Sequence, residues 1–493
     1  MEGIEQSQCA RPGEVPVRSA LTARTALVAG LALAAGLALR IWMLRWLFEV
    51  NGDSLIYGGI GKNLLLHGRY ALTTAHGEMY PTLMRLPGYP LFLAACFRLF
   101  GMENYWAAAC VEIALELAGC LLLADFAQLA ARGVSGSNEE FARRAALATL
   151  WLAALCPFTA AYAAEPLAEA PTLFALALTM WSMARFHEQP RWATALSFTF
   201  GMTWATLLRP DGALAALAFA PVMLMKQGAG NREQGAETVR GRGAAHPLRM
   251  AVVCALLAIA PFAVWTWRNW QVFHVFEPLA PRLATDPGEN LNPGWERWVK
   301  SWCLDFISTY QIYWNVPDDR LDVTQLPSRA FDSPAQYAET AALAHDYNAH
   351  GHQLTPQIDA GFARLAEERI AAHPFRYYLW LPLGRVTDMW LRPRVENLPI
   401  DLDWWVYAHH YAETRFSWFY VGLNALYILL AGIGLWLRPR YGMALLAYMV
   451  LRSALLLTVE APEARYTLEC FPMIFALGGV AVAATVRRVV ARF

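Results

Sequence analysis

Long apolar stretches recur along this chain, and polar segments separate them. A helix that crosses a bilayer needs roughly 20 mostly apolar residues, and about ten stretches approach that length. They are Thr25–Leu47, Tyr105–Ala130, Ala145–Ala161, Leu167–Phe186, Ala193–Leu208, Gly212–Met225, Met250–Val272, Phe416–Leu437, Tyr441–Val459 and Thr467–Val486. The Gly212–Met225 stretch is short, which fits a tilted or re-entrant segment. The pattern predicts an all-α polytopic membrane protein.

Lys and Arg gather in every second loop between these stretches, and loops of this kind face the cytoplasm. The residues are Arg11, Arg18, Arg24, Arg132, Arg143, Arg144, Arg185, Arg191, Lys226, Arg232, Arg240, Arg242, Arg249, Arg438, Arg440, Arg487, Arg488 and Arg492. The alternation predicts an even number of spans with both termini in the cytoplasm. We also expect a flexible cytoplasmic loop at Gly228–His246. The first stretch lacks a small-residue cleavage pattern, so we expect a retained anchor.

Two long segments then fall on the outer side of the membrane, at about residues 48–104 and 273–415. Within the second, Ser333–Ala349 and Pro356–Ala372 have the pattern of amphipathic helices with Ser or Thr near their starts. Pro374–Leu391 is apolar and aromatic but contains Arg385 and Asp388, and such charges favour a helix lying in the membrane interface.

These segments divide the chain into three expected units. Residues 1–272 form a transmembrane module that includes the first outer loop. Residues 273–415 form a mostly helical outer loop domain, and residues 416–493 form the last transmembrane helices. Composition agrees with a membrane protein, because 57% of the 493 residues are hydrophobic and only 16% are charged. The formal net charge is zero, which argues against a nucleic-acid partner.

Asp53 follows the first apolar stretch and precedes an amphipathic helical pattern that contains Tyr57. An Asp in this place can simply cap the helix. A carboxylate at the membrane–water boundary can also stay ionised and reach a lipid-borne substrate. The two roles are compatible. Glu165 adds a second acid on the same side, where the dipole of the following helix would also stabilise it.

Several arginines on the outer side oppose the bias toward basic cytoplasmic loops. Arg85 begins the turn before a short interfacial helix, and Arg209 and Arg465 stand at the outer ends of spans. A guanidinium binds phosphate oxygens bidentately, so phosphate binding is one explanation. Pairing with a nearby carboxylate, or snorkelling in the interface, is the alternative. For Arg268, which lies near the outer end of the seventh apolar stretch, either explanation fits.

Glu112 and Glu116 lie on one face of the second span. Carboxylates in lipid are costly and usually face a cavity or a partner. They are the main support for an alternative function as a transporter or lipid flippase, although no paired half-helix pattern accompanies them. A non-catalytic membrane scaffold is a third possibility. The histidines of the large outer segment show no metal-ligand spacing, so no metal is expected.

An ordered set of short motifs resembles the protein-mannosyltransferase-like and aminoarabinose-transferase-like membrane glycosyltransferases. The motifs are Gly52-Asp53, Gly68-Arg69-Tyr70, Arg85-Leu86-Pro87-Gly88-Tyr89-Pro90, Ala164-Glu165-Pro166-Leu167, Leu208-Arg209-Pro210-Asp211, Arg268-Asn269-Trp270, Phe276-Glu277-Pro278-Leu279 and Arg465-Tyr466. The resemblance implies a C-type glycosyltransferase fold and a polyprenyl-phosphate sugar donor used on the outer face. Two positions depart from it: Ser54 stands where protein mannosyltransferases often have a second acid, and Arg85 replaces a Lys of the aminoarabinose-type enzymes.

The resemblance implies that Asp53 is the catalytic carboxylate and that Glu165 is the second acidic position. We expect Asp53 to act as general base in an inverting transfer. Arg85, Arg209 and Arg465 are candidates to bind the donor phosphate, so no cofactor is required. Further residues expected to line the substrate cavity are Tyr57, Tyr89, Arg268, Glu460 and Glu463. The acceptor would be a lipid, a glycan or a protein, and the expected location is a bacterial cytoplasmic membrane.

Overall fold

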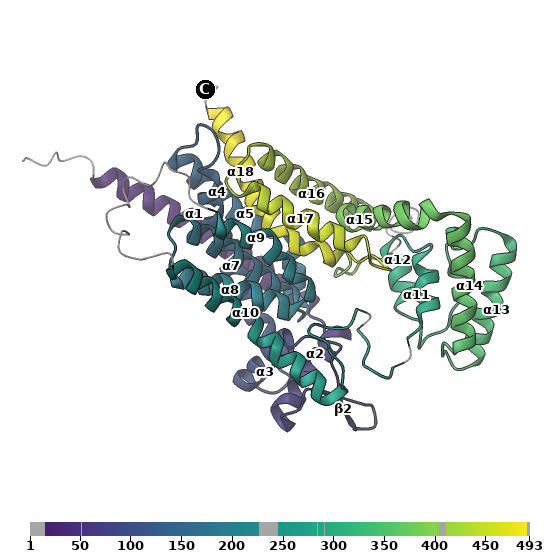
Figure 1. Ribbon diagram of the computed structural model, residues 1–493. Helices are drawn as coiled ribbons and strands as arrows, with labels where there is room; N and C mark the ends of the chain where they lie inside the picture. The colour runs from purple at the N-terminus through teal and green to yellow at the C-terminus, as the bar shows by residue number, and fades with distance from the viewer. Residues whose placement is uncertain are drawn as a thin grey trace, which may run out of the picture.

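The computed structural model describes residues 15–50, 52–225, 245–282, 284–289, 291–401, 403 and 411–490. Over these residues the chain is largely helical, as the apolar pattern predicts (Figure 1). The helices are α1 (Val15–Leu47), α2 (Gly52–His67), α3 (Gly88–Phe100), α4 (Tyr105–Ala131), α5 (Glu139–Ala154), α6 (Pro157–Ala161), α7 (Glu169–Glu188), α8 (Trp192–Leu208), α9 (Leu214–Leu224), α10 (Ala245–Phe273), α11 (Pro293–Lys300), α12 (Phe306–Ser308), α13 (Pro334–Ala349), α14 (Pro356–Ala372), α15 (Leu381–Leu391), α16 (Tyr411–Trp436), α17 (Gly442–Leu456) and α18 (Phe471–Val490). The expected loop Gly228–His246 lies outside the described residues except for its last two positions, which belong to α10. Residues 1–14 and 491–493 also lie outside them.

Each stretch expected to cross the membrane is helical. Among the described residues, six helices have the length and hydropathy of membrane spans. They are Ala23–Leu47, Tyr105–Ala131, Glu139–Ala164, Arg249–Phe273, Tyr411–Trp436 and Ala464–Val489. The shorter apolar helices are Gly88–Phe100, Pro210–Leu224 and Gly442–Leu456. The remaining expected spans are α7, which has charged residues in its end turns, and α8, which is 17 residues long. The protein is therefore an all-α, multi-pass membrane protein.

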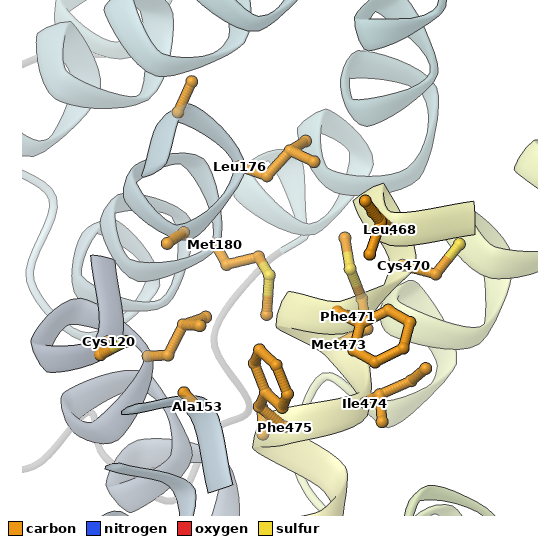
Figure 2. Close-up of a cluster of buried hydrophobic side chains, with 14 of the residues drawn as sticks. Cys120, Ala153, Leu176, Met180, Leu468, Cys470, Phe471, Met473, Ile474 and Phe475 are labelled. Atoms are coloured by element: carbon orange, nitrogen blue, oxygen red, sulfur yellow. The ribbon is translucent and has the colours of Figure 1, made fainter. Parts of the chain in front are cut away.

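Small residues let the membrane helices pack closely around α18. A Cβ atom added at Gly434 would lie 1.9 Å from the carbonyl oxygen of Leu477, and one added at Gly479 would lie 1.9 Å from Thr149. The backbones of α16 and α5 thus approach α18 more closely than a side chain would allow, as is typical of membrane helix contacts. Figure 2 shows the buried side chains of α4, α7 and α18 that meet beside these contacts.

The 48–104 segment folds into α2, a short hairpin and α3. The hairpin strands are β1 (Ala71–Thr73) and β2 (Met79–Pro81), and they pair antiparallel with Leu72 opposite Tyr80. Asp53 lies in the first turn of α2, so it does not precede this helix. It thus stands near the N-terminal end of the helix, where the dipole favours a carboxylate.

The 273–415 segment contributes a group of helices beside one end of the membrane bundle (Figure 1). The two amphipathic helices are confirmed as α13 and α14, and the side chains of Ser333 and Thr355 cap them. The core of this group is aromatic, with Trp295 and Trp298 both packed against Phe362 at 5.0 Å between ring centroids.

Residues 376–391 of this segment form a π-helical turn followed by α15. This helix is not among the candidate membrane spans in the described part of the chain. The large side chains of Phe375, Tyr378 and Trp380, in the π-helical turn or directly before it, are exposed, whereas Arg385 of α15 is fully buried. An apolar outer surface with a charge turned inward fits the interfacial position expected for it.

Candidate active site

A large cavity of about 1960 Å³ lies where the 48–104 segment, the membrane helices and the 273–415 segment come together. Its lining includes Asp53 and Glu165, the three arginines expected to bind phosphate, and three further predicted residues. The arginines are Arg85, Arg209 and Arg465, and the three further residues are Tyr57, Glu460 and Glu463. Eight of the ten residues expected at the substrate site therefore lie around one space, although they come from distant parts of the sequence.

Asp53 lies between two guanidinium groups. Arg85 Nη2 donates a 2.6 Å hydrogen bond to Asp53 Oδ1, and Arg465 Nη2 donates a 3.2 Å hydrogen bond to Oδ2. Burial opposes ionisation of this carboxyl group, but the charges of Arg85 and Arg465 outweigh burial and lower its pKa. Asp53 is therefore ionised at neutral pH. The guanidinium of Arg85 also lies 5.7 Å from the ring centre of Tyr57.

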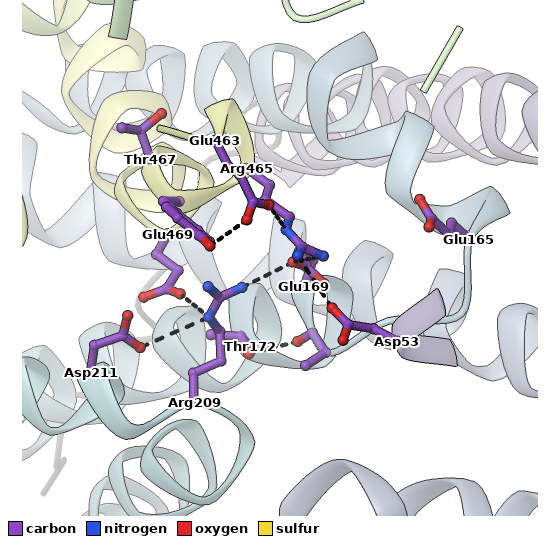
Figure 3. A network of polar contacts seen from close by, with 12 residues as sticks. Asp53, Glu165, Glu169, Thr172, Arg209, Asp211, Glu463, Arg465, Thr467 and Glu469 are labelled. Carbon is purple, nitrogen blue, oxygen red and sulfur yellow. Dashed lines mark hydrogen bonds and ion pairs between the residues drawn. The ribbon is translucent and has the colours of Figure 1, made fainter. Parts of the chain in front are cut away.

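Arg465 is bound on several sides (Figure 3). Its Nε donates a short hydrogen bond to Glu463, and its Nη1 lies 3.9 Å from Glu169 Oε1. Tyr466 donates its hydroxyl hydrogen to the same Glu463 carboxylate. These partners hold the guanidinium of Arg465 in one orientation beside Asp53.

Arg209 belongs to a second, more buried part of this network (Figure 3). Its Nη1 donates to Glu169 Oε1 at 2.9 Å, and its Nε lies 2.9 Å from Glu469 Oε1. Arg452 is fully buried and binds Glu469 at 3.1 Å as well as Asp211. Each of these arginines therefore shares its carboxylate partners with another arginine, and Glu169 joins Arg209 to the Asp53–Arg465 group.

Glu165 follows a 3₁₀ turn and precedes Pro166, four residues before α7 begins. Its Oε2 accepts a 3.1 Å hydrogen bond from the side-chain amide of Asn397, which belongs to the 273–415 segment. Burial, followed by the negative charge of Glu169, raises the pKa of Glu165 to about 7. Glu165 and Asp53 are thus two carboxyl groups in one cavity with pKa values shifted in opposite directions.

Glu460 is also on the cavity wall, but its partners differ from those of Glu463. It binds Arg282 and accepts a 3.1 Å hydrogen bond from Lys300 Nζ. These pairs connect the segment before α18 to the 273–415 segment.

Two residues expected at the cavity lie elsewhere. Tyr89 is fully buried and donates a 2.6 Å hydrogen bond to Glu112. Its ring packs on Tyr57 at 5.0 Å, so it supports a cavity residue from behind. Arg268 donates to the backbone carbonyls of Thr82 and Tyr70 at 2.8 Å each, and it therefore fastens the 48–104 segment to α10. Neither residue lines the cavity, because tertiary packing gives each a buried partner.

Glu112 and Glu116, the basis of the transporter alternative, also lie away from this cavity. Arg40 Nε and Nη2 donate to the two carboxylate oxygens of Glu116 at 2.8 and 2.6 Å. Glu112 is fully buried beneath Tyr89. The large cavity is thus not centred on these two acids.

Sequence reasoning missed four charged or polar members of the site: Glu169, Glu469, Arg452 and Asn397. Signals for three of them are present in the sequence. Glu169 stands one helical turn after Glu165, Glu469 one turn after Arg465, and Arg452 interrupts an apolar stretch. No local pattern marks Asn397, because its partner is 232 positions away in the chain.

Within the described part of the chain, no group of three or more His, Cys, Asp and Glu side chains has an arrangement that could hold a metal ion. Glu169 and Glu469 instead form ion pairs with Arg209, and Glu469 also pairs with Arg452.

Two membrane glycosyltransferases of known structure are similar to this chain. ArnT from Cupriavidus metallidurans, solved bound to undecaprenyl phosphate, shares 14% identity with a TM-score of 0.36, and the match covers 92% of this chain and 78% of that one. The archaeal oligosaccharyltransferase AglB from Archaeoglobus fulgidus, solved in complex with an inhibitory peptide and a dolichol-phosphate, shares 12% identity with a TM-score of 0.43. That match covers 94% of this chain and 50% of AglB.

No protein-family profile matches the chain, and no curated protein does.

Proposed function

We propose that this protein is a C-type membrane glycosyltransferase that moves a sugar from a polyprenyl-phosphate donor to an acceptor on the outer face of the cytoplasmic membrane. The observation that carries this proposal is the position of Asp53, an ionised carboxylate held between Arg85 and Arg465 at the edge of a large cavity. One group able to take a proton and two able to bind phosphate oxygens stand side by side there.

In the proposed reaction, Asp53 accepts the proton of an acceptor hydroxyl as that oxygen attacks the anomeric carbon of the donor sugar. The new carbon–oxygen bond forms as the bond to the phosphate oxygen breaks, and the phosphate leaves with the bonding electrons. Attack from the face opposite the leaving group inverts the anomeric configuration. Arg85, Arg465 and Arg209 stabilise the charge that develops on the phosphate.

The arginines give this mechanism a way to raise the basicity of Asp53. While both guanidinium groups bind its oxygens, Asp53 is a weak base. When a donor phosphate accepts hydrogen bonds from Arg85 or Arg465, less positive charge remains for Asp53, and its pKa rises. The carboxylate then becomes a better proton acceptor when the donor is present.

Glu165 and Asn397 fit a role in orienting the acceptor. The Glu165 carboxylate accepts one hydrogen bond from Asn397 and has further capacity to accept one from a hydroxyl group. Its pKa of about 7 means that this capacity grows as the pH rises through neutrality. We propose no metal, because a phosphate monoester leaving group can be stabilised by arginines alone.

The transporter alternative has weaker support. It needs Glu112 and Glu116 in a water-accessible path, whereas Arg40 neutralises Glu116 and both acids are buried. The basic loops support the proposed orientation, in which the end of the bundle that bears Asp53 faces the outer side.

The experiment that tests this function compares membranes from cells with and without the protein. Mass spectrometry of envelope lipids and glycans should show one or more species heavier by a sugar residue only when the protein is present. Addition of purified protein to the deficient membranes should restore these species. Identical envelope profiles in the two strains would contradict a glycosyltransferase function.

A further inference from the structure

Three aromatic side chains that the proposed mechanism does not use form part of the cavity wall: Phe306, Tyr310 and Trp314. We refer to them as the aromatic wall. The ring centroid of Trp314 lies 5.5 Å from that of Phe306 and 5.7 Å from that of Tyr310. Tyr310 is 50% exposed and Trp314 44%, so part of their ring surface is open to a ligand.

The backbone holds the aromatic wall in an unusual way. α12 continues directly into a π-helical turn, Thr309–Tyr313, which carries Tyr310. Turns of this type are rare and occur frequently at functional sites. The hydroxyl of Thr309 donates a 3.0 Å hydrogen bond to the carbonyl oxygen of Pro462, three residues before Arg465. The wall is therefore fastened to the segment that supplies a partner of Asp53.

Charged and polar residues next to the aromatic wall contact Phe306 and add polar groups to the cavity lining. The guanidinium of Arg392 lies 4.8 Å from the ring centre of Phe306. Glu396, Asn397 and Gln311 line the same cavity. The side chain of Glu396 is 8% exposed, and its Oε1, although 3.1 Å from Arg392 Nε, accepts no hydrogen bond. Glu396 and Asn397 thus add a carboxylate and an amide to the cavity lining beside the aromatic wall.

Exposed aromatic rings beside amide and carboxylate groups match the chemistry of a sugar ring. A pyranose has an apolar C–H face, which packs on an aromatic surface, and a rim of hydroxyl groups, which donate to carboxylates and amide oxygens. A prenyl chain would need only the apolar part of this surface.

We propose that the aromatic wall binds a sugar ring of the acceptor, which makes the acceptor a glycan or a glycolipid headgroup. This inference rests on the proposed glycosyltransferase function. The prenyl tail of the donor has to stay among the apolar membrane helices, whereas the wall belongs to the 273–415 segment. We therefore assign the aromatic wall to the second substrate, the acceptor.

Saturation-transfer NMR with the full-length protein in detergent tests this inference, with cellobiose, chitobiose and maltose as probes. We expect at least one disaccharide to receive saturation from the wild-type protein. Trp314→Ala and Tyr310→Ala should each weaken its binding about three- to tenfold, because each removes one ring surface. Trp314→Phe keeps an aromatic face and should largely retain binding. Trp436→Ala is the control, since Trp436 is 84% exposed on α16 and does not line the cavity.

The outcomes separate this inference from the proposed function. Asp53→Asn tests transfer and Trp314→Ala tests disaccharide binding, so loss of transfer and loss of sugar binding are independent results. Absence of a signal with all three sugars, or wild-type affinity in Trp314→Ala, would overturn the inference. Undecaprenyl phosphate glucose should leave the disaccharide signal in place. If it displaces the disaccharide, the wall holds the sugar of the donor, and the assignment to the acceptor is wrong.

Discussion

Asp53 and Arg465 are 412 positions apart in the chain, yet the guanidinium group of Arg465 donates a 3.2 Å hydrogen bond to the Asp53 carboxylate. Arg85 occupies the other carboxylate oxygen. The carboxylate thus sits where the oxygens of a donor phosphate would bind if these arginines serve that purpose. Competition between Asp53 and the phosphate would couple donor binding to the basicity of Asp53.

This competition predicts the effect of Asp53→Asn on donor binding. The neutral amide binds guanidinium groups less strongly than a carboxylate does, so Arg85 and Arg465 become more available to phosphate. Asp53→Asn should bind undecaprenyl phosphate at least as tightly as wild type, as measured by native mass spectrometry of the purified protein. A clear loss of affinity would mean that Asp53 supports the phosphate site instead of competing for it.

Arg465→Ala should have the opposite effect on the same measurement. Loss of a charge-assisted hydrogen bond costs about 1.5–3 kcal/mol, so affinity for undecaprenyl phosphate should fall about ten- to hundredfold. Arg282→Ala is a matched control, because Arg282 also lines the cavity but has a side chain that is 64% exposed. Equal affinities in wild type and Arg465→Ala would remove Arg465 from the phosphate site.

Glu165 should give both activity and stability a pH dependence near neutrality. Its pKa of about 7 in the folded protein is above the ordinary value of 4.5, so the protonated form favours folding. This contribution to stability is complete below about pH 4.5 and is lost as the pH rises through 7. If the ionised form orients the acceptor, kcat/KM should rise over the same interval.

Glu165→Gln isolates these effects. The melting temperature of the variant relative to wild type should increase between pH 6 and pH 8 (~1 unit on either side of the folded pKa). Its kcat/KM should be lower and nearly independent of pH in that interval. A wild-type rise in kcat/KM that persists unchanged in Glu165→Gln would assign the titrating group to another residue.

Glu169 should matter for stability more than any exposed ion pair. It is 5% exposed and binds Arg209, and it lies near Arg465. Glu169→Ala removes one of the carboxylates that bind Arg209 in a mostly buried network, and the loss of this charge-assisted hydrogen bond costs about 1.5–3 kcal/mol. Glu103→Ala removes a partner of Lys62 at the surface and should cost at most about 1 kcal/mol. Thermal unfolding in detergent compares the two variants. Similar unfolding midpoints for both would contradict the bridging role of Glu169.

Much of the fold was predictable, because apolar periodicity and helix-capping residues are local properties. The membrane helices and α13 and α14 follow from these signals directly. The clustering of Asp53, Glu165 and the arginines was also predictable, since alternating basic loops put all of them on one side of the membrane. However, a shared side of the membrane does not decide which of these residues line the same cavity.

The pairings inside the site were not predictable from local sequence. Glu169 binds an arginine 40 positions away, and Asn397 reaches Glu165 across 232 positions. Tyr89 and Arg268 carry the right chemistry for the cavity but bury it against Glu112 and backbone carbonyls instead. Such choices depend on tertiary packing, which no short motif encodes.

Sugar transfer by Asp53→Asn tests the central claim most directly. Cells that lack the protein are complemented with wild type or with the variant, and the sugar-modified envelope species are quantified by mass spectrometry. Asp53→Asn keeps the shape of the side chain but cannot accept the hydroxyl proton, so the modified species should be absent although the variant is present in the membrane and binds undecaprenyl phosphate. Modification at a level near that of wild type would show that Asp53 is not the catalytic base.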